Sequence, residues 1–286
     1  MPHKSPFNYI GNKYRIINEL LSIFPDNIHT FVDMFCGGGD VFINTSAEHK
    51  IANDVNYHLI DIMREFQNQD AENIFQYIDT TIREWGLNKT DRDAYIRFRE
   101  HYNDAPIPLD LFILVCFTFN HQLRFNSNHQ FNNPFGKDRS SFNASTRRNL
   151  AYFLEAIQNV QLASEDFRNV NLAQLGENDF VYADPPYTLT CGPYNDGKRG
   201  FNGWSLNDDL DLTGILDNLN DNGVRFALSN VIHHKGKAHP FLLEWAADKG
   251  YTVHRPTVSY NNSNYQVIDK ENESQEVIIT NLPHNG

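Results

Sequence analysis

The sequence predicts an α/β protein with a doubly wound sheet that is interrupted by one mostly helical insertion. Short apolar runs typical of buried strands alternate with helical patterns near both ends of the chain, whereas helical patterns prevail in its middle third. One apolar run leads into a glycine-rich turn, and another ends in a carboxylate followed by two prolines. We therefore expect residues 1–56 and 160–286 to form one domain and residues 57–159 to form a second.

Composition excludes several classes of protein. A chain of 286 residues with 40% apolar and 13% aromatic side chains is long enough to bury a full core and is typical of a globular protein. The three cysteines lack CxxC spacing, which argues against a disulfide framework and against zinc and favours a reducing compartment. The chain opens without an apolar signal segment, and its most apolar run, 109–119, is too short to cross a membrane. We expect a cytoplasmic monomer with no membrane partner.

The secondary structure is expected in the following order. Apolar residues at helical spacing predict helices at 16–24, 59–66, 74–85, 95–102, 108–119 and 240–249, with a further helix beginning at Ser205 and Asp208. Apolar runs predict strands at 28–35, 50–54, 160–163, 179–183, 224–229, 251–259 and 276–281. The polar, glycine-rich residues 188–203 are too poor in apolar periodicity for packed core, and we expect them to form a lid.

A glycine-rich turn follows the first expected strand. The run Cys36-Gly37-Gly38-Gly39-Asp40 precedes an apolar stretch from Val41 that we expect to be helical. Glycines at such a turn let a ligand approach the backbone, as nucleotide-type sites require. The spacing is not GxGxxG, and no lysine follows as in a phosphate-binding loop. Asp33 inside the strand suits a cationic ligand better than a pyrophosphate.

A second carboxylate, Asp54, ends the next strand about twenty residues later. From this position in doubly wound folds a carboxylate binds a ribose diol. An aspartate at a strand end is often only a helix cap, but its pairing with the glycine turn favours the ribose interpretation.

A local positive patch is expected in the insertion, although the net charge of −12 argues against a general nucleic-acid binder. Phe125 and Phe131 flank a polar tip, which predicts a β-hairpin or an ordered loop. Five basic side chains lie between residues 121 and 148 against the single acid Asp138: Arg124, Lys137, Arg139, Arg147 and Arg148. Arginine and asparagine also read guanine and adenine edges in duplex DNA. The alternative is a solvated surface loop.

The run Asp184-Pro185-Pro186-Tyr187 follows the strand at 179–183. The two prolines stiffen the backbone and expose the Pro185 carbonyl. The Asp184 carboxylate and this carbonyl can each accept one N–H of an amino group on a flat heterocycle, while the Tyr187 ring stacks on its face. The alternative is a strand-end turn in which Asp184 merely caps an amide.

Taken together, these motifs resemble those of the Dam-type (D12 class) DNA adenine-N6 methyltransferases, over about residues 7–281. The likeness rests on their order along the chain: Phe7-Asn8-Tyr9-Ile10-Gly11-Asn12-Lys13, Asp33-Met34-Phe35-Cys36-Gly37-Gly38-Gly39, Asn53-Asp54, Asp166-Phe167, Asp184-Pro185-Pro186-Tyr187, Leu228-Ser229-Asn230 and Glu276-Val277-Ile278-Ile279-Thr280-Asn281. It implies a Rossmann-like methyltransferase sheet and an insertion that recognises the target.

The resemblance also implies roles for individual residues. S-adenosylmethionine would be bound by Tyr9, Lys13, Asp33, Phe35, Gly37, Gly39, Asp54, Asp166 and Phe167, with Asp184 beside it. Asp184, Pro185 and Tyr187 would hold the target adenine. The DNA would be contacted by Asn8, Arg124, Asn126, Asn132, Pro134 and Lys137. Asn8 is a departure, because members that recognise GATC usually carry a lysine there that helps to read the outer guanine.

The implied function is methyl transfer from S-adenosylmethionine, with S-adenosylhomocysteine as product, to N6 of a flipped-out adenine in GATC or a related duplex site. No metal is needed, and the histidines show no ligand spacing. Three alternatives remain at this point: a methyltransferase of RNA, one of protein glutamine amides, and a catalytically inactive DNA-binding relative. A cognate restriction endonuclease would be a genetic partner without physical contact.

Overall fold

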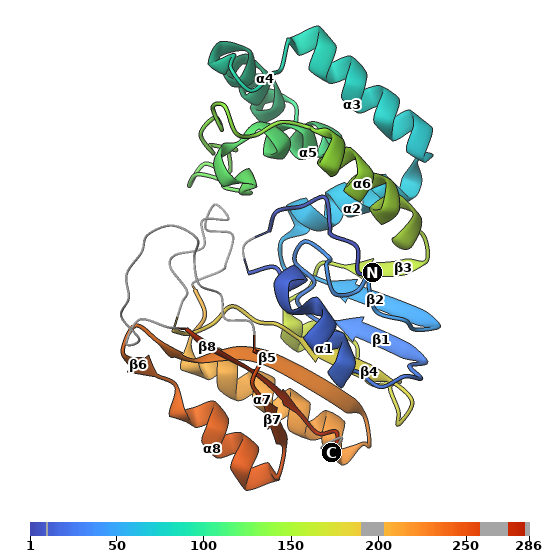
Figure 1. Cartoon of the computed structure of the whole chain (residues 1–286), viewed down its shortest axis with the longest axis vertical. Coiled ribbons are helices and arrows are strands. Elements are labelled where there is room, and N and C mark those ends of the chain that lie inside the picture. The colour runs from blue at the N-terminus through green and yellow to red at the C-terminus, as the bar shows by residue number, and fades with distance from the viewer. Residues whose placement is uncertain (10, 190–202, 258–273, 284–286) are drawn as a thin grey trace.

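The computed structural model describes residues 1–9, 11–189, 203–257 and 274–283, and its described strands form one sheet (Figure 1). The sheet order is β3-β2-β1-β4-β5-β8-β7, with β6 paired to β5. The strands are β1 (Thr30–Asp33), β2 (His49–Asn53), β3 (Val160–Ala163), β4 (Phe180–Ala183), β5 (Arg225–His234), β6 (Lys237–Ala238), β7 (Thr252–His254) and β8 (Gln275–Thr280). β3, β2, β1, β4 and β5 are parallel, whereas β8 runs antiparallel to β5 and β7. The predicted α/β class with a mostly parallel sheet is therefore confirmed.

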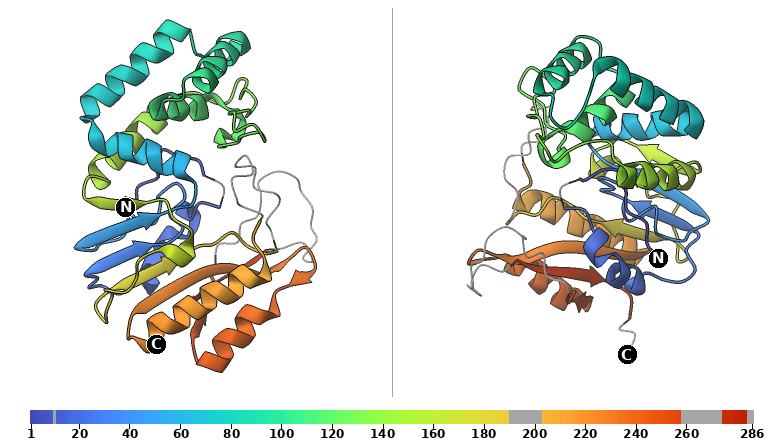
Figure 2. Two further views of the ribbon diagram at one scale, coloured as in Figure 1. Left: turned by 180° about the vertical axis from the view of Figure 1, so that it is seen from behind. Right: turned by 45° about the horizontal axis from the view of Figure 1, so that its top comes forward.

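Alternation along the central strands gives the sheet two buried faces. Phe31, Phe180 and Tyr182 face one apolar cluster, which includes Ile17 and Leu20 of α1 (Ile17–Ile23). Their neighbours Val32, Val181 and Ala183 face a second cluster, which includes residues of α7 (Leu206–Asp221) and α8 (Pro240–Lys249). The view from behind brings α7 and α8 in front of the sheet (Figure 2). Strands buried on both faces read as continuous apolar runs, which is why they could be predicted.

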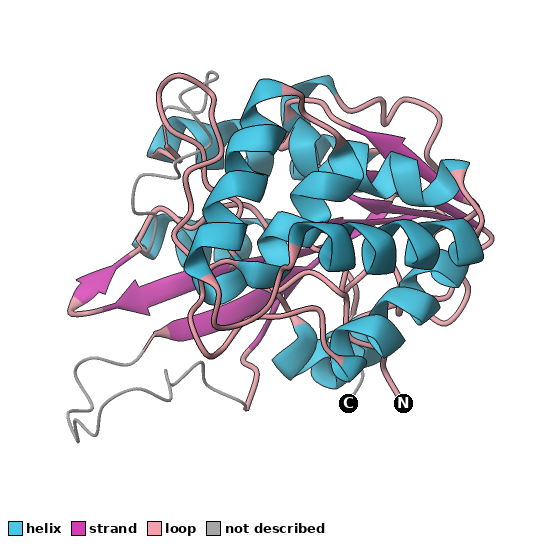
Figure 3. Cartoon of the chain, turned by 90° about the horizontal axis from the view of Figure 1, so that it is seen from above, coloured by secondary structure: helices cyan, strands magenta, loops and turns pink. Residues whose placement is uncertain are grey.

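Five helices lie between β2 and β3 along the chain: α2 (Tyr57–Asn68), α3 (Ala71–Trp85), α4 (Arg92–Asp104), α5 (Pro108–Phe117) and α6 (Ala144–Ala156). Every residue of α5 after Pro108 is buried, because α2, α3 and α4 pack around it. Seen from above, these helices lie over the strands (Figure 3). Phe66, Phe112 and Phe153 belong to the same apolar cluster as Phe31 and Phe180, so this core is continuous from the sheet into the helices.

Helix α6 was not predicted, although its sequence carries the signals. The Asn143 side chain accepts hydrogen bonds from the backbone N–H groups of Ser145 and Thr146, at 2.9 and 3.0 Å. Leu150, Phe153 and Leu154 then recur at helical spacing on the buried face. An asparagine cap followed by this spacing is a usual helix start.

The helix expected from Val41 is wrong, since residues 41–44 form turns and residues 45–47 have no regular secondary structure. The Asn44 side chain donates to the carbonyl of Asp40 at 2.7 Å, and the Thr45 hydroxyl donates to that of Val41 at 2.9 Å. The Asn44 side chain occupies the Asp40 carbonyl, and the Asn44 backbone amide donates to the Val41 carbonyl instead, so the helical pattern is not continued there.

Other predicted boundaries differ less. β5 extends five residues beyond the predicted strand, β6 was not predicted, and the expected lid lies mostly outside the described residues. Of the predicted β-hairpin or ordered loop, the structure has the loop, which is closed by the isolated bridge Phe125–Phe131 near the short 3₁₀ turn η2 (Phe119–His121). Two further 3₁₀ turns are η1 (Tyr14–Ile16) and η3 (Phe167–Asn169). Within the described residues, no helix has the length and apolar character needed to span a membrane.

Candidate active site

Four of the predicted acids lie near the carboxyl edge of the parallel strands. Asp33 is the last residue of β1 and pairs in register with Tyr182 of β4. Asp184 lies two residues after Tyr182, so the two acids are close to the same strand ends. Asp54 follows β2, and Asp166 follows β3. The Asn53 side chain joins these strand ends by donating to the carbonyls of Met34 and Glu165, at 3.0 and 3.1 Å. Because parallel strands end at one edge, residues distant in the sequence meet there.

Lys13 and Asp184 form a largely buried ion pair at this edge. The Lys13 Nζ lies 2.7 Å from Asp184 Oδ2, and the two side chains are 3% and 16% exposed. The same Nζ lies 2.6 Å from the Tyr187 hydroxyl and 3.3 Å from Glu276 Oε1. Burial raises the pKa of Asp184, and the Lys13 ammonium offsets part of that rise. Lys13 was predicted to line the cofactor pocket, but its ammonium contacts the predicted acceptor of the target amine.

Tyr187 is also held by its hydroxyl. It donates to Asp184 Oδ1 at 2.8 Å and lies 3.2 Å from Glu276 Oε1. The Lys13 Nζ lies 5.1 Å from the centre of its ring, within the range of a cation–π contact. Glu276, at 8% exposure, completes this cluster and was not named as a site residue by the sequence. Its place in the closing motif was the available signal, but its partner Lys13 lies near the other end of the chain.

Asp33 is a buried carboxylate without a hydrogen-bond donor among the described residues, and it is 1% exposed. Burial raises the pKa of Asp33 well above its usual range, and the charges of Asp184 and Asp54 raise it further. The amides of Phe35 and Phe42 lower it in part, although they lie outside hydrogen-bond geometry. A buried, unpaired carboxylate is costly, and a cationic group would satisfy it. Asp33 therefore suits a cationic ligand.

The glycine turn is shaped by close packing. Gly37 has a φ of +46°, and a Cβ there would lie 2.9 Å from the Tyr9 ring; Gly39 has a φ of +88°, and a Cβ there would lie 2.6 Å from Phe42. Asp54 accepts the backbone N–H of Gly37 at 2.9 Å and that of Asn56 at 2.8 Å. Asp54 thus accepts two backbone amides but caps no helix, because α2 begins after Asn56 without a side-chain cap. Each carboxylate oxygen retains a lone pair with which it could accept a ribose hydroxyl.

An aromatic cluster lies beside the turn. Phe35, Phe167 and Trp204 pack with ring centres 5.2 to 5.6 Å apart. Asp166, 46% exposed, pairs with Arg168 and caps η3 through the Arg168 amide at 2.9 Å. Trp204 was not predicted, because it lies just after a segment without apolar periodicity.

Asp209 is a second buried acid that the sequence analysis missed. Its carboxylate accepts hydrogen bonds from the Trp204 indole at 2.8 Å and the Thr188 hydroxyl at 2.6 Å, and it lies 2.8 Å from His239 Nε2. Trp204 and Thr188 lie on opposite sides of residues 190–202 along the chain. Asp209 thus links Thr188 and Trp204, the two residues that flank this segment, through hydrogen bonds.

The predicted DNA-contacting residues fall into two groups. Asn8, Arg124, Pro134 and Lys137 are exposed. Asn126, however, accepts the amides of Asn128 and Gln130 at 2.9 and 3.0 Å, so its side-chain carbonyl shapes the loop tip. Asn132 is half-buried, with its side-chain oxygen unpaired among the described residues.

The positive patch is smaller than the sequence indicated. Arg147 forms an ion pair with Asp79, and its guanidinium lies 4.8 and 5.1 Å from the ring centres of Phe75 and Phe142. Such a paired, stacked arginine contributes to packing more than to a phosphate-binding surface. Arg124, Lys137, Arg139 and Arg148 remain as exposed cations.

Comparison with known proteins assigns the family. A sequence model described as the D12 class N6 adenine-specific DNA methyltransferase matches residues 9–262. The chain belongs to this family. The family predicted from the ordered motifs is therefore confirmed.

Individual relatives fall into two size classes. The chain is 46% identical over 280 residues to the modification methylase StsI of Streptococcus sanguinis and 44% identical to the type II methyltransferase M.FokI of Planomicrobium okeanokoites. Each alignment covers 97% of this chain and 43% of the relative, so the chain spans less than half the length of these relatives. A DNA adenine methylase of Salmonella typhimurium is 26% identical over 92% of this chain and 91% of its own.

Proposed function

We propose that the chain transfers a methyl group from S-adenosylmethionine to N6 of adenine in a short duplex DNA site. The main support for this function is a pair of carboxylates at the ends of adjacent strands. Asp33 has no hydrogen-bond donor among the described residues, and Asp184 contacts the Lys13 ammonium. One suits a cationic cofactor, and the other suits an N–H donor. Family membership selects adenine as the base.

The cofactor contacts follow from the same edge. Asp33 and Phe35 would contact the methionine moiety, Asp54 the ribose hydroxyls, and Asp166 and Phe167 the adenine ring. When bound, S-adenosylmethionine supplies an electrophilic methyl group and leaves as S-adenosylhomocysteine. Tyr9, beside Gly37, and the buried Lys13 enclose the site from the opening segment.

The target amine needs both acceptors, because its lone pair is conjugated into the adenine ring. Asp184 Oδ2 and the Pro185 carbonyl would each accept one N–H, so that the nitrogen can pyramidalise and direct its lone pair at the methyl group. The protein contributes orientation and electrostatics more than proton abstraction. Since Lys13 Nζ contacts Asp184 Oδ2 in this structure, the arriving amine would share that oxygen with the ammonium or displace it.

A base inside a duplex cannot reach Asp184, so we propose that it is flipped out. Residues 57–159 would recognise the site, with residues 1–56 and 160–286 carrying catalysis. GATC or a related sequence is the proposed site, and the exposed Arg124 is the proposed guanine reader. Two relatives are named as a modification methylase and a type II methyltransferase, and we propose a restriction endonuclease as the genetic partner of this chain.

Single-molecule methylation sequencing of a naive host that expresses the chain tests this function, because it reports the modified base and the site together. We expect N6-methyladenine in one short motif. A transfer assay with labelled cofactor on duplex DNA and on structured RNA separates the RNA alternative, and a chain that binds DNA without transfer would be the inactive relative.

Tyr187→Ala should weaken transfer by removing the stacking surface for the extruded base, worth on the order of 1–3 kcal/mol. The loss should shrink when the target adenine is mispaired, since flipping then costs less. Tyr187→Phe is the matched control: it keeps the ring and removes only the hydroxyl bound to Asp184 and Lys13. Single-turnover rates of both variants on paired and mispaired duplexes test this expectation. Equal losses on the two substrates would mean that Tyr187 is structural.

Arg124→Ala should relax selectivity at one base of the site, by about 1–3 kcal/mol, because arginine reads guanine O6 and N7 bidentately. Lys137→Ala, also at an exposed position, should weaken binding evenly across sequences and flatten its salt dependence. With Asn8 in place of a lysine, discrimination at the first base should be the weakest. Duplexes varied one position at a time around GATC test all three. Uniform loss for Arg124→Ala would make that arginine a phosphate contact.

A further inference from the structure

The Lys13 ammonium competes with the target amine for Asp184 Oδ2, because a charged donor binds a carboxylate oxygen more strongly than a neutral one. Both oxygens of Asp184 have donors in this structure, Tyr187 on Oδ1 and Lys13 on Oδ2. Lys13 is 3% exposed, so water cannot readily solvate the displaced charge. A buried ammonium without a counter-ion is strongly unfavourable.

Glu276 is placed to receive it. Its Oε1 already lies 3.3 Å from Lys13 Nζ and 3.2 Å from the Tyr187 hydroxyl. Its backbone is fixed in β8, where Glu276 pairs with Val231 of β5. The carbonyl of Gly11, 3.1 Å from Nζ, provides a further acceptor but no charge.

We propose that Glu276 is a positioning residue that holds the Lys13 ammonium during catalysis and so leaves Asp184 Oδ2 for the adenine amine. This rests on the proposed function. Without the Glu276 charge, Lys13 stays on Asp184 and competes with the substrate amine. Glu276 touches neither substrate nor cofactor in this role; it acts through Lys13.

Glu276→Gln tests the role because it keeps the shape and removes the charge. We expect the single-turnover rate to fall about tenfold, within the range of coupling between contacting residues, with unchanged cofactor affinity. Glu276→Asp keeps the charge and should recover part of the rate. The decisive readout is a double-mutant cycle: in a Lys13→Met background, Glu276→Gln should cost less than about threefold, because no ammonium remains to be held.

Additive losses in the cycle would overturn the proposal and make Glu276 merely structural. So would an unchanged rate for Glu276→Gln. These outcomes differ from failure of the proposed function, in which the unsubstituted chain itself would transfer no methyl group to any DNA.

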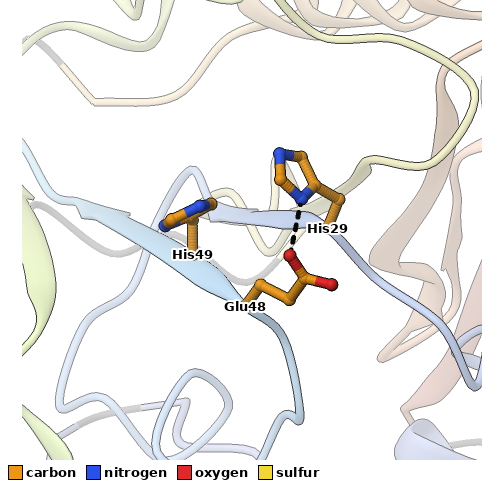
Figure 4. A group of neighbouring side chains, drawn as sticks. All are labelled: His29, Glu48 and His49. Atoms are coloured by element: carbon orange, nitrogen blue, oxygen red, sulfur yellow. Dashed lines mark hydrogen bonds and ion pairs between the residues drawn. The ribbon is translucent and has the colours of Figure 1, made fainter.

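A separate cluster lies at the opposite end of the strands. His29 comes directly before β1, while Glu48 and His49 lie at the start of β2 (Figure 4). His29 Nδ1 is 3.0 Å from Glu48 Oε2, and the two imidazole rings are 5.0 Å apart. One ligand atom from each of the three exposed side chains lies within 4.8 Å of the others. Sequence spacing concealed the group, because pairing of β1 with β2 brings it together.

The backbone of this cluster is already fixed. The amide of His49 donates to the carbonyl of His29 at 2.8 Å, and the amide of His29 donates to that of Asn178 at 2.9 Å. Two imidazoles and a carboxylate suit zinc, nickel or copper rather than magnesium or calcium. The geometry points to a surface site for such a divalent ion, which would join the amino-terminal ends of β1 and β2 and take no part in methyl transfer.

Titration of the chelator-treated full chain with Ni²⁺ or Zn²⁺ in a calorimeter tests this site. We expect one saturable ion, and at least about tenfold weaker binding for His29→Ala and for His49→Ala. His129→Ala, an exposed histidine on the distant loop tip, is the matched control and should bind normally. Absence of binding, or binding that survives both substitutions, would overturn the proposal.

Discussion

Asp184→Ala is expected to lower the methyl-transfer rate about 10²- to 10³-fold, the usual cost of losing one oriented group that stabilises a transition state. The substitution removes the acceptor of one target N–H and leaves the Asp33 edge of the site in place. Cofactor affinity should therefore fall only modestly. Single-turnover rates on a duplex substrate, together with cofactor binding by calorimetry, separate the two effects.

Asp179→Ala is the matched control, because Asp179 lies just before the other end of the same strand. Its carboxylate accepts the amides of Thr30 and Gly176, both at 2.8 Å, so its loss should lower the melting temperature without changing the rate of the folded protein. Near-normal turnover in Asp184→Ala would contradict the assignment of Asp184 as the amine acceptor.

The fold could be predicted largely because its strands are buried on both faces. Val181 and Tyr182 face different apolar clusters, so the sequence of β4 is apolar at every position and stands out without an alignment. Asp33 and Asp184 were found for a related reason: each is a charge at the end of such a run. Local patterns of this kind are complete within a few residues.

Contacts between distant segments could not be predicted in the same way. Glu276 meets Lys13 only because β8 inserts between β5 and β7, an arrangement that no local pattern specifies. Asn126 and Arg147 were predicted as part of a DNA surface by residue type, but hydrogen bonds to the loop and an ion pair with Asp79 engage them internally. Side-chain competition likewise stopped the helix expected from Val41.

Asp33→Asn is expected to change stability and cofactor affinity in opposite directions. Because the Asp33 carboxylate is buried and lacks a hydrogen-bond donor among the described residues, removing its charge should stabilise the cofactor-free protein by about 1–3 kcal/mol. The same change removes the counter-ion proposed for the cationic methionine moiety. Cofactor binding should weaken on the order of 10- to 100-fold, the usual worth of a hydrogen bond to a charged group.

The raised pKa of Asp33 also determines how the free energy of unfolding changes with pH. The folded-state pKa of Asp33 is raised, so the folded protein binds a proton that the unfolded chain has already released. The free energy of unfolding therefore falls as pH rises from the ordinary aspartate value through the raised one, and the full cost is present above it. The advantage of Asp33→Asn should therefore grow as the pH rises from the ordinary aspartate value and should shrink on acidification, as thermal melts without cofactor would measure.

Asp54→Asn provides the comparison, because both Asp54 oxygens accept backbone amides, at 2.9 and 2.8 Å. An asparagine there must turn an NH₂ group toward one of those N–H donors, so it should destabilise the cofactor-free protein. The two substitutions remove the same charge at neighbouring strand ends, and only the hydrogen-bonding of the carboxylate differs. If Asp33→Asn were as destabilising as Asp54→Asn, Asp33 would have a structural partner, and its assignment to a cationic ligand would be wrong.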